Sequence, residues 1–291
     1  MKVISLFDGM ACGLTALKRV GVRVTEYHAF EIDPYAIAIA KRNHPEIIHH
    51  GTVEGANFER FNGADLLIGG SPCQGFSFAG KQLAFDDPRS KLFFEYVRAR
   101  DEIQPVSWLL ENVKMKKEHL AVITLYMKTC PILINSARVS AQNRERYYWF
   151  NWSAKQPQDK HIELRDIIEH GYVDRDKAYC VDAHYFKSGF TNYFNRSRRQ
   201  LVFEKPHGKN NGGAKERFKF ATLRPCTPHN YAIRDGVHWR KLTPLECERL
   251  QTVDEGYTAG ISNTQRYKML GNGWTVDVIA HLFREAGFDL V

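Results

Sequence analysis

The sequence predicts an α/β fold built on a Rossmann-like, mostly parallel sheet, with a second, smaller region that is mostly irregular or β. In the first half, short apolar runs alternate with helix-like stretches, which is the pattern of repeated β-α units. After about Trp152 this alternation fades into a polar stretch rich in Gly, Asn, Arg and His. A chain of 291 residues, 43% of them hydrophobic, is long enough for one large domain and a smaller one.

The expected strands are short apolar runs that end near turn residues. They cover residues 3–7, 28–32, 47–50, 65–69, 107–111, 132–137 and 147–152. The expected helices cover residues 14–20, 34–43, 92–103, 119–128 and 276–286. Thr243 can cap a further helix that opens with Pro244. Gly-Asn-Gly at 271–273 is expected to precede the last helix as a turn.

The net charge of +8 is concentrated in one segment. Residues 187–224 contain ten Lys or Arg against two acidic residues, so the rest of the chain is neutral as a group. Phe and Tyr alternate with these charges, as on a surface that contacts both phosphates and bases. A localised positive charge favours a polyanionic partner. A solvated basic face over core aromatics remains the alternative.

The composition gives no sign of a secreted or membrane-bound protein. The first apolar run is too short for a signal peptide, and no later stretch approaches a membrane span. The six cysteines lack the close spacing of zinc sites or disulfide frameworks. We therefore expect a cytoplasmic protein with reduced thiols and no metal.

A thiol follows the fourth expected strand on a restrained loop. Residues 65–70 read as a buried strand that ends in two glycines, and Ser-Pro-Cys-Gln at 71–74 follows directly. Pro72 fixes the backbone before Cys73, and loops at this edge of open α/β sheets carry chemistry. Cys73 is therefore a candidate nucleophile. A small buried hydrophobic residue is the alternative.

Two further groups are expected near Cys73. Glu111 ends a buried strand and would lie at the same sheet edge if both strands are parallel, where it could act as a general acid. Arg144 and Arg146 alternate on one strand or turn and could hold an anion or a carbonyl oxygen. Surface salt bridging is the commoner use of such arginines.

The first expected turn indicates a cofactor with a nucleoside. Gly9 and Gly13 follow the first strand and permit close approach of a ligand to the backbone. Glu31 ends the second strand, where a carboxylate can accept hydrogen bonds from both ribose hydroxyls. A diphosphate is less favoured, because the turn lacks the full glycine set and no P-loop lysine follows.

Five motifs occur in one order. They are Ser-Pro-Cys-Gln at 71–74, Glu-Asn-Val at 111–113, Gln-x-Arg-x-Arg at 142–146, Lys-Leu-Thr-Pro-Leu-Glu-Cys-Glu-Arg-Leu-Gln at 241–251 and Gly-Asn-Gly at 271–273. This order resembles the DNA (cytosine-5) methyltransferases, and the size resembles a prokaryotic or phage enzyme of restriction-modification type. The resemblance implies a catalytic, cofactor-binding domain of residues 1–159, completed by residues 262–291. It also implies a target-recognition domain of residues 160–261, which includes the unmatched stretch from about 160 to 237.

The resemblance implies S-adenosyl-L-methionine as methyl donor and S-adenosyl-L-homocysteine as product. Where the family often has an acid that meets the adenine amino group, this chain has Thr52, so that contact is in doubt. The residues expected around the cofactor are Phe7, Asp8, Gly9, Gly13, Glu31, Ile32, Thr52, Pro72, Asn272 and Trp274. Trp274 could equally be a core aromatic.

The resemblance also implies the chemistry. Cys73 would add to carbon 6 of a flipped cytosine, Glu111 would protonate or hydrogen-bond nitrogen 3, and Arg146 with Arg144 behind it would hold the cytosine oxygen. The residues expected to contact DNA are Gln74, Ser77, Lys81, Arg89, Arg196, Arg198 and Arg199.

The expected partner is double-stranded DNA, met by a monomer in the cytoplasm of a bacterial or phage-infected cell, at the nucleoid. Two alternatives stay open at this point. One is an RNA cytosine-5 methyltransferase, since a structured RNA presents an unpaired cytosine more readily. The other is a catalytically weak homologue that only binds DNA, which the substitution at Thr52 keeps open. The recognised DNA sequence and any accompanying restriction enzyme cannot be read from the chain.

Overall fold

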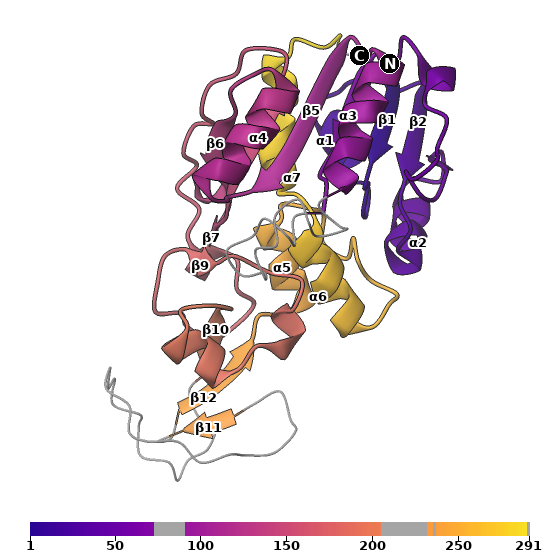
Figure 1. Cartoon of the computed structure of the whole chain (residues 1–291). Coiled ribbons are helices and arrows are strands. Elements are labelled where there is room, and N and C mark those ends of the chain that lie inside the picture. Colours follow the sequence, from indigo (N-terminus) through magenta and orange to yellow (C-terminus); the bar gives the residue numbers. More distant parts are fainter. Residues whose placement is uncertain (73–90, 205–231, 235–236, 290–291) are drawn as a thin grey trace.

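The computed structural model describes residues 1–72, 91–204, 232–234 and 237–289. These residues fold around a seven-stranded sheet of order β3-β2-β1-β4-β5-β8-β6 (Figure 1). Its strands are β1 (Lys2–Leu6), β2 (Glu26–Phe30), β3 (Ile48–His49), β4 (Leu66–Gly69), β5 (Ser107–Val113), β6 (Ile132–Asn135) and β8 (Glu145–Phe150). Strands β1 to β5 pair in parallel, while β8 runs antiparallel to both β5 and β6. The predicted mostly parallel α/β sheet is confirmed.

Helices cover both faces of this sheet. On one face α1 (Cys12–Arg19), α2 (Pro34–Asn43) and α7 (Val276–Glu285) share a large apolar core with the strands. On the other face α3 (Leu92–Ile103) and α4 (Lys117–Met127) pack on a second core rich in Phe and Tyr. The amphipathic sequence explains the docking, because α7 buries positions 278, 279, 282 and 283 on one stripe.

Two elements differ from the expectation. The predicted strand over 132–137 stops at Asn135, because the Asn135 side chain accepts a hydrogen bond from the Ala137 N–H and caps a short 3₁₀ helix. Helix α6 (Asn263–Asn272) was not predicted, and it includes the Gly271 and Asn272 that were expected to form a turn. A Cβ at Gly271 would clash with the backbone of residues 182–183, which explains the glycine inside a helix.

The described part of the smaller region contains short strands and little helix, as predicted. A three-stranded antiparallel sheet has the order β10-β12-β11, and a parallel pair joins β7 to β9. The bounds are β7 (Gln142–Asn143), β9 (Ala178–Tyr179), β10 (Leu201–Glu204), β11 (Ala232–Arg234) and β12 (Val237–Lys241). The pairing of β7 with β9 brings the start of the smaller region to the strand that precedes β8.

The motif at 241–251 builds the joint between the two regions. It forms α5 (Pro244–Leu250), which Thr243 and Glu246 cap reciprocally in a capping box. The buried Glu246 carboxylate also accepts two 2.8 Å hydrogen bonds from the Arg240 guanidinium. Figure 1 shows α5 and α6 between the sheet and the smaller region. The motif therefore stabilises the joint between the two regions of the protein.

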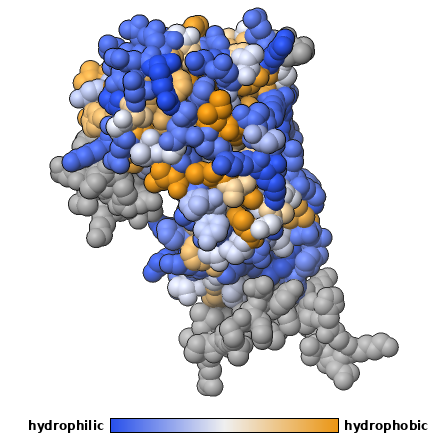
Figure 2. Space-filling model, turned by 90° about the vertical axis from the view of Figure 1, so that its right-hand side faces the viewer, coloured by the Kyte–Doolittle hydropathy of each residue, from blue (hydrophilic) through white to orange (hydrophobic). Residues whose placement is uncertain are grey.

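The face shown in Figure 2 is largely hydrophilic, with apolar residues gathered across its middle. No helix within the described ranges has the length and apolar character needed to cross a membrane.

Candidate active site

The pairing of β4 with β5 brings Gly70, which shortly precedes Cys73 in the sequence, next to Glu111. The two strands pair in parallel with Gly69 opposite Leu110, so Gly70, just past the end of β4, lies beside Glu111. Glu111 does not end its strand as predicted, because β5 continues to Val113 and pairs Glu111 with Tyr148 of β8. A Cβ at Gly70 would lie only 3.0 Å from Glu111 Oε2, so a side chain there would disturb the carboxylate. The Asn112 side-chain amide donates to Ser71 Oγ at 3.2 Å and ties the entry of the loop to β5.

Five predicted residues of this loop cannot be placed. Cys73, Gln74, Ser77, Lys81 and Arg89 lie outside the described residues. The half-buried Pro72 is the last described residue before the thiol. The predicted roles of the loop therefore remain predictions.

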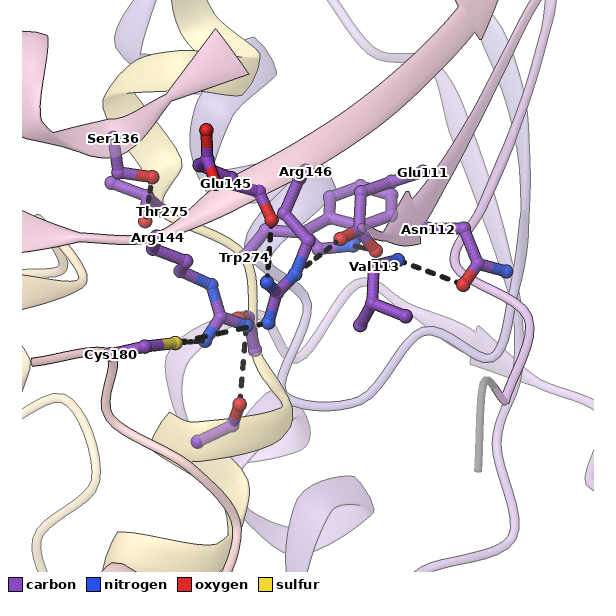
Figure 3. Close-up of polar contacts among 12 residues, drawn as sticks. Glu111, Asn112, Val113, Ser136, Arg144, Glu145, Arg146, Cys180, Trp274 and Thr275 are labelled. Atoms are coloured by element: carbon purple, nitrogen blue, oxygen red, sulfur yellow. Dashed lines mark hydrogen bonds and ion pairs between the residues drawn. The ribbon is translucent and has the colours of Figure 1, made fainter. Parts of the chain in front are cut away.

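The Glu111 carboxylate is buried and has a partner at each oxygen (Figure 3). Arg146 Nε lies 3.0 Å from Oε1, and the Trp274 indole N–H donates to Oε2 at 3.0 Å. Both side chains of the ion pair are largely removed from solvent, with 15% of Arg146 and 11% of Glu111 exposed. The antiparallel pairing of β8 with β5 explains how Arg146 returns to this edge.

Arg144 lies behind Arg146 and serves a different purpose. Its buried guanidinium donates to the carbonyl oxygens of Val181 at 3.0 Å and Gly273 at 2.8 Å, with a longer bond to Gly271 O at 3.2 Å. These bonds join the smaller region to the segment between α6 and α7. Arg144 therefore clamps three chain segments together around Arg146.

Sequence reasoning did not single out Cys180, which the structure places against both arginines (Figure 3). Its sulfur accepts from Arg144 Nη1 at 3.2 Å and lies 4.0 Å from Arg146 Nη2. Burial alone would raise the pKa of the Cys180 thiol, but the two adjacent guanidinium groups lower it below its usual value. No local signal predicts this contact, because it depends on the pairing of β7 with β9.

The turn between β1 and α1 has an unusual backbone. Phe7, Gly9 and Ala11 all have left-handed conformations, with φ of 57°, 60° and 65°. Two of the three are not glycine, and such strain is commonly held at ligand-binding sites. The Gly9 N–H donates to Glu31 Oε2 at 2.8 Å, so the structure brings the two predicted parts of the cofactor site together.

Asp8 in this turn is half-buried, and within the described residues its carboxylate has no ion pair. Its Oδ1 accepts from Ser5 Oγ and from the Tyr27 hydroxyl, both at 2.6 Å. Its Oδ2 is inaccessible to solvent and has no partner among the described residues. Burial raises the pKa of Asp8 to about 6, although the hydrogen bonds from Ser5 and Tyr27 oppose the rise. An unpartnered buried oxygen of this kind fits a site for a hydrogen-bond donor of a ligand.

The other predicted cofactor residues lie around the same edge. A Cβ at Gly13 would clash with Ile68, and it would also lie 3.5 Å from the Trp274 ring, so the turn packs closely there. Ile32 is 72% exposed and offers an apolar surface next to Glu31. Thr52 is exposed and its Oγ1 accepts from the Glu54 N–H at 3.2 Å. Asn272 is exposed at the end of α6.

The three predicted DNA-contacting arginines of the smaller region are not equivalent. Arg196 and Arg198 are exposed. Arg199 is mostly buried and forms an ion pair with Asp182, with 3.0 Å between Nε and Oδ2. Arg199 therefore has a structural partner that the sequence did not reveal. Over the part of the chain that the structure describes, no group of three or more His, Cys, Asp or Glu could hold a metal ion.

The comparisons with known proteins concern the chain as a whole. Residues 1–287 match the family described as C-5 cytosine-specific DNA methylase. The chain is 30% identical to the type II methyltransferase M1.ScrFI of Lactococcus lactis subsp. cremoris, over 96% of this chain and 76% of that protein. It is 26% identical to the orphan methyltransferase M.SPRI of Bacillus phage SPR, over 98% and 97%. The crystal structure of a Spodoptera frugiperda DNMT2 mutant has the same fold, with a TM-score of 0.68 at 20% identity over 98% of each chain.

Proposed function

Because the chain belongs to the C-5 cytosine-specific DNA methylase family, we propose that it methylates a flipped cytosine through a covalent bond between Cys73 and carbon 6. The activity of the family is transfer of a methyl group to carbon 5 of cytosine in DNA. The observation that carries the assignment of residues is the Glu111 carboxylate, buried between Arg146 and Trp274 and next to Gly70 at the entry of the Cys73 loop.

The residues account for each bond that changes. Carbon 5 of cytosine is a poor nucleophile, and addition of the Cys73 thiolate to carbon 6 makes carbon 5 enamine-like. Glu111 protonates or hydrogen-bonds nitrogen 3 while the ring gains electron density. After carbon 5 has gained the methyl group, a base removes its proton. The Cys73–carbon 6 bond then breaks, which restores the aromatic ring and the thiolate.

Arg146 has two roles in this proposal. It compensates the Glu111 charge from 3.0 Å, and its guanidinium stabilises charge on the cytosine oxygen. Arg144 supports it from behind through main-chain carbonyls and the shared sulfur of Cys180. A displaced Arg146 would leave a buried carboxylate unpaired, which is costly.

The family depends on S-adenosylmethionine, and the β1–α1 turn fits it. When bound, the cofactor supplies a methyl group on a positively charged sulfur. Asp8 would accept a donor through its unpartnered Oδ2, and Gly9 has open space beside it in the turn. Glu31 would meet the ribose and Ile32 the adenine face. The exposed Thr52 hydroxyl is a weaker adenine partner than an acid.

Double-stranded DNA is the substrate in this proposal. Removing a base from the duplex costs a few kcal/mol, roughly, which protein contacts must offset. The exposed Arg196 and Arg198 belong to the segment that holds the whole net charge, and they would contact phosphates. We expect a monomer, in which one active site meets one flipped base.

A methyl-transfer assay tests the proposal. Tritiated S-adenosylmethionine is offered with duplex DNA or with structured RNA, to the wild-type protein, Cys73→Ala and Glu111→Gln. We expect duplex DNA to be labelled by the wild type, no turnover by Cys73→Ala and a loss of about a hundredfold or more in Glu111→Gln. Cys130→Ser removes an exposed cysteine and is the matched control with wild-type activity.

Each alternative gives a different result. Labelling of RNA with no labelling of DNA supports the RNA enzyme. Absence of cofactor binding by calorimetry supports a binding protein without activity. Turnover by Cys73→Ala would refute the covalent route. Bisulfite sequencing of DNA from expressing cells then reads the methylated site.

A further inference from the structure

We propose that Trp274 is a positioning residue for Glu111 and links this carboxylate to the β1–α1 turn. The inference rests on the proposed acid role of Glu111. It assigns to Trp274 an action on the reaction that is separate from any contact with the cofactor.

The indole fixes the oxygen of Glu111 that Arg146 does not. Trp274 Nε1 lies 3.0 Å from Oε2, while Arg146 Nε lies 3.0 Å from Oε1. Figure 3 shows the two side chains reaching the carboxylate. A Cβ at Gly70 would lie 2.9 Å from the indole nitrogen and 3.0 Å from Oε2, so the glycine leaves space for this bond. The carboxylate is therefore held in one orientation.

The chain at Gly273 and Trp274 packs against the β1–α1 turn, where Cys12 is buried. A Cβ at Gly273 would lie 2.9 Å from Met10 Cε and 3.4 Å from Cys12 Sγ, so the two segments are in close contact. The indole ring also approaches Gly13 of the same turn. One residue thus contacts both the proposed cofactor turn and the proposed acid.

A neutral donor suits this position. Arg146 already supplies one positive charge to Glu111, and a second cation would favour the ionised carboxylate over the form that donates a proton. The indole N–H directs Oε2 without adding charge. The geometry gives Trp274 the task of keeping Glu111 aimed at the base while Arg146 compensates its charge.

Trp274→Phe tests this role, because it keeps an aromatic ring and removes the N–H. We expect kcat on duplex DNA to fall about tenfold, with a shift of the alkaline limb in the pH profile of kcat, which is the limb that a general acid sets. The dissociation constant for S-adenosylmethionine, measured by calorimetry, should stay within about threefold because the ring remains. Trp152→Phe is the matched control, since that indole donates to Leu282 O at 3.1 Å on the far α7 face and its loss should leave kcat unchanged.

A double-mutant cycle separates this inference from the proposed function. If Trp274 acts through Glu111, then Trp274→Phe causes no additional loss in a Glu111→Gln background. The inference is overturned if Trp274→Phe keeps the wild-type kcat, or if its loss is equally large in that background. Wild-type activity of Glu111→Gln itself would instead refute the proposed function.

A second variant covers the case in which Trp274→Phe does not fold. Gly70→Ala places a methyl group 2.9 Å from the indole nitrogen and 3.0 Å from Glu111 Oε2, which disturbs their hydrogen bond while the chain keeps a tryptophan at position 274. We expect a similar loss of kcat with unchanged cofactor affinity. An unchanged kcat in a folded Gly70→Ala protein would also contradict the inference.

Discussion

Asp8 and Glu111 are two carboxylates at the same edge of one sheet, but they have different kinds of hydrogen-bond and ion-pair partners. Glu111 is buried beside a cation, with Arg146 Nε 3.0 Å away and a neutral donor on its other oxygen. Asp8 is held only by neutral hydroxyl groups, and its Oδ2 has no partner among the described residues. Burial accordingly raises the pKa of Asp8 to about 6.

The two carboxylates differ in where their charge is compensated. Glu111 is compensated by the protein itself, whereas we assign the open oxygen of Asp8 to a donor group of a ligand. A buried charge is tolerated when a partner compensates it, and otherwise the group tends to take up a proton. Glu111 has its charge partner in the folded chain itself. Asp8 has a vacant oxygen in the turn that we assign to a cofactor carrying donor groups.

Replacement of Arg146, the ion-pair partner of Glu111, should have the largest effect on the methyl-transfer rate. Arg146→Met keeps an unbranched apolar stem and removes the charged guanidinium, so we expect the methyl-transfer rate to fall by about a hundredfold to a thousandfold. Single-turnover assays on duplex DNA measure it. Lys114→Met is a matched control, because its ion pair with Glu145 at the same strands is exposed and should contribute little to activity. Equal losses in the two variants would contradict the assignment.

A third buried carboxylate tests the same rule through stability. Glu246 is fully buried and pairs with Arg240, which is 4% exposed. Glu246→Ala should lower the free energy of unfolding by about 3 to 5 kcal/mol, because the buried Arg240 guanidinium loses one of its two carboxylate partners and keeps only Glu204, and because α5 loses its capping box. Urea titration measures the change. The exposed Asp101 forms a surface pair with Arg100, so Asp101→Ala should cost less than about 1 kcal/mol.

For Asp8 we expect the opposite of Glu246, namely that removal of the carboxylate charge increases the stability of the folded protein. Its pKa is about 6 when folded and 3.8 in a model carboxyl, so the unfolded chain releases the proton first as pH rises. The stability from the protonated form is full below about pH 4 and is lost as pH rises through about 6. Asp8→Asn stays neutral and should exceed the wild type by about 1 to 3 kcal/mol at pH 8 without cofactor.

Thermal unfolding at several pH values checks the sign. The two proteins should have nearly equal stability at pH 4, diverge between about pH 4 and pH 6, and keep a constant difference at higher pH. An Asp8→Asn protein that is less stable than the wild type at pH 8 would mean that the carboxylate is compensated by a group in the chain.

Much of this architecture is readable from the sequence, because apolar periodicity is local. Helix α3 has the predicted bounds, and the Thr243 cap was predicted from two adjacent residues. Helix α6 was missed because it is polar and ends in Gly271-Asn272, although Ser262 supplies an ordinary cap. The left-handed Phe7 and Ala11 could not be predicted, since neither residue type favours that backbone.

The same limit applies to the candidate site. The sequence motifs grouped Glu111, Arg144 and Arg146, but they did not predict that the two arginines have different partners. That difference depends on β7 pairing with β9, which directs Arg144 to the smaller region and brings Cys180 to both. Tertiary pairing over more than thirty residues leaves no local trace, so it had to come from the structure.

The smallest expected effect concerns the basic segment. Arg196→Ala with Arg198→Ala should reduce the slope of log affinity against log salt by up to about one unit per phosphate contact. Arg199→Ala should leave the slope unchanged and lower thermal stability, because Asp182 loses its partner. Filter-binding titrations at several salt concentrations distinguish the two. The same slope change in both proteins would place Arg199 on the DNA.

The covalent bond to the base tests the central claim most directly. Duplex DNA that carries 5-fluorocytosine cannot lose a proton from carbon 5, so the adduct should persist and be mapped by mass spectrometry after proteolysis. We expect the adduct on Cys73, and we expect it to form only when S-adenosylmethionine is present. The Glu111→Gln protein should form this adduct more slowly than the wild type, by at least about tenfold. An adduct on another residue, or wild-type speed in Glu111→Gln, would contradict the proposed catalytic group.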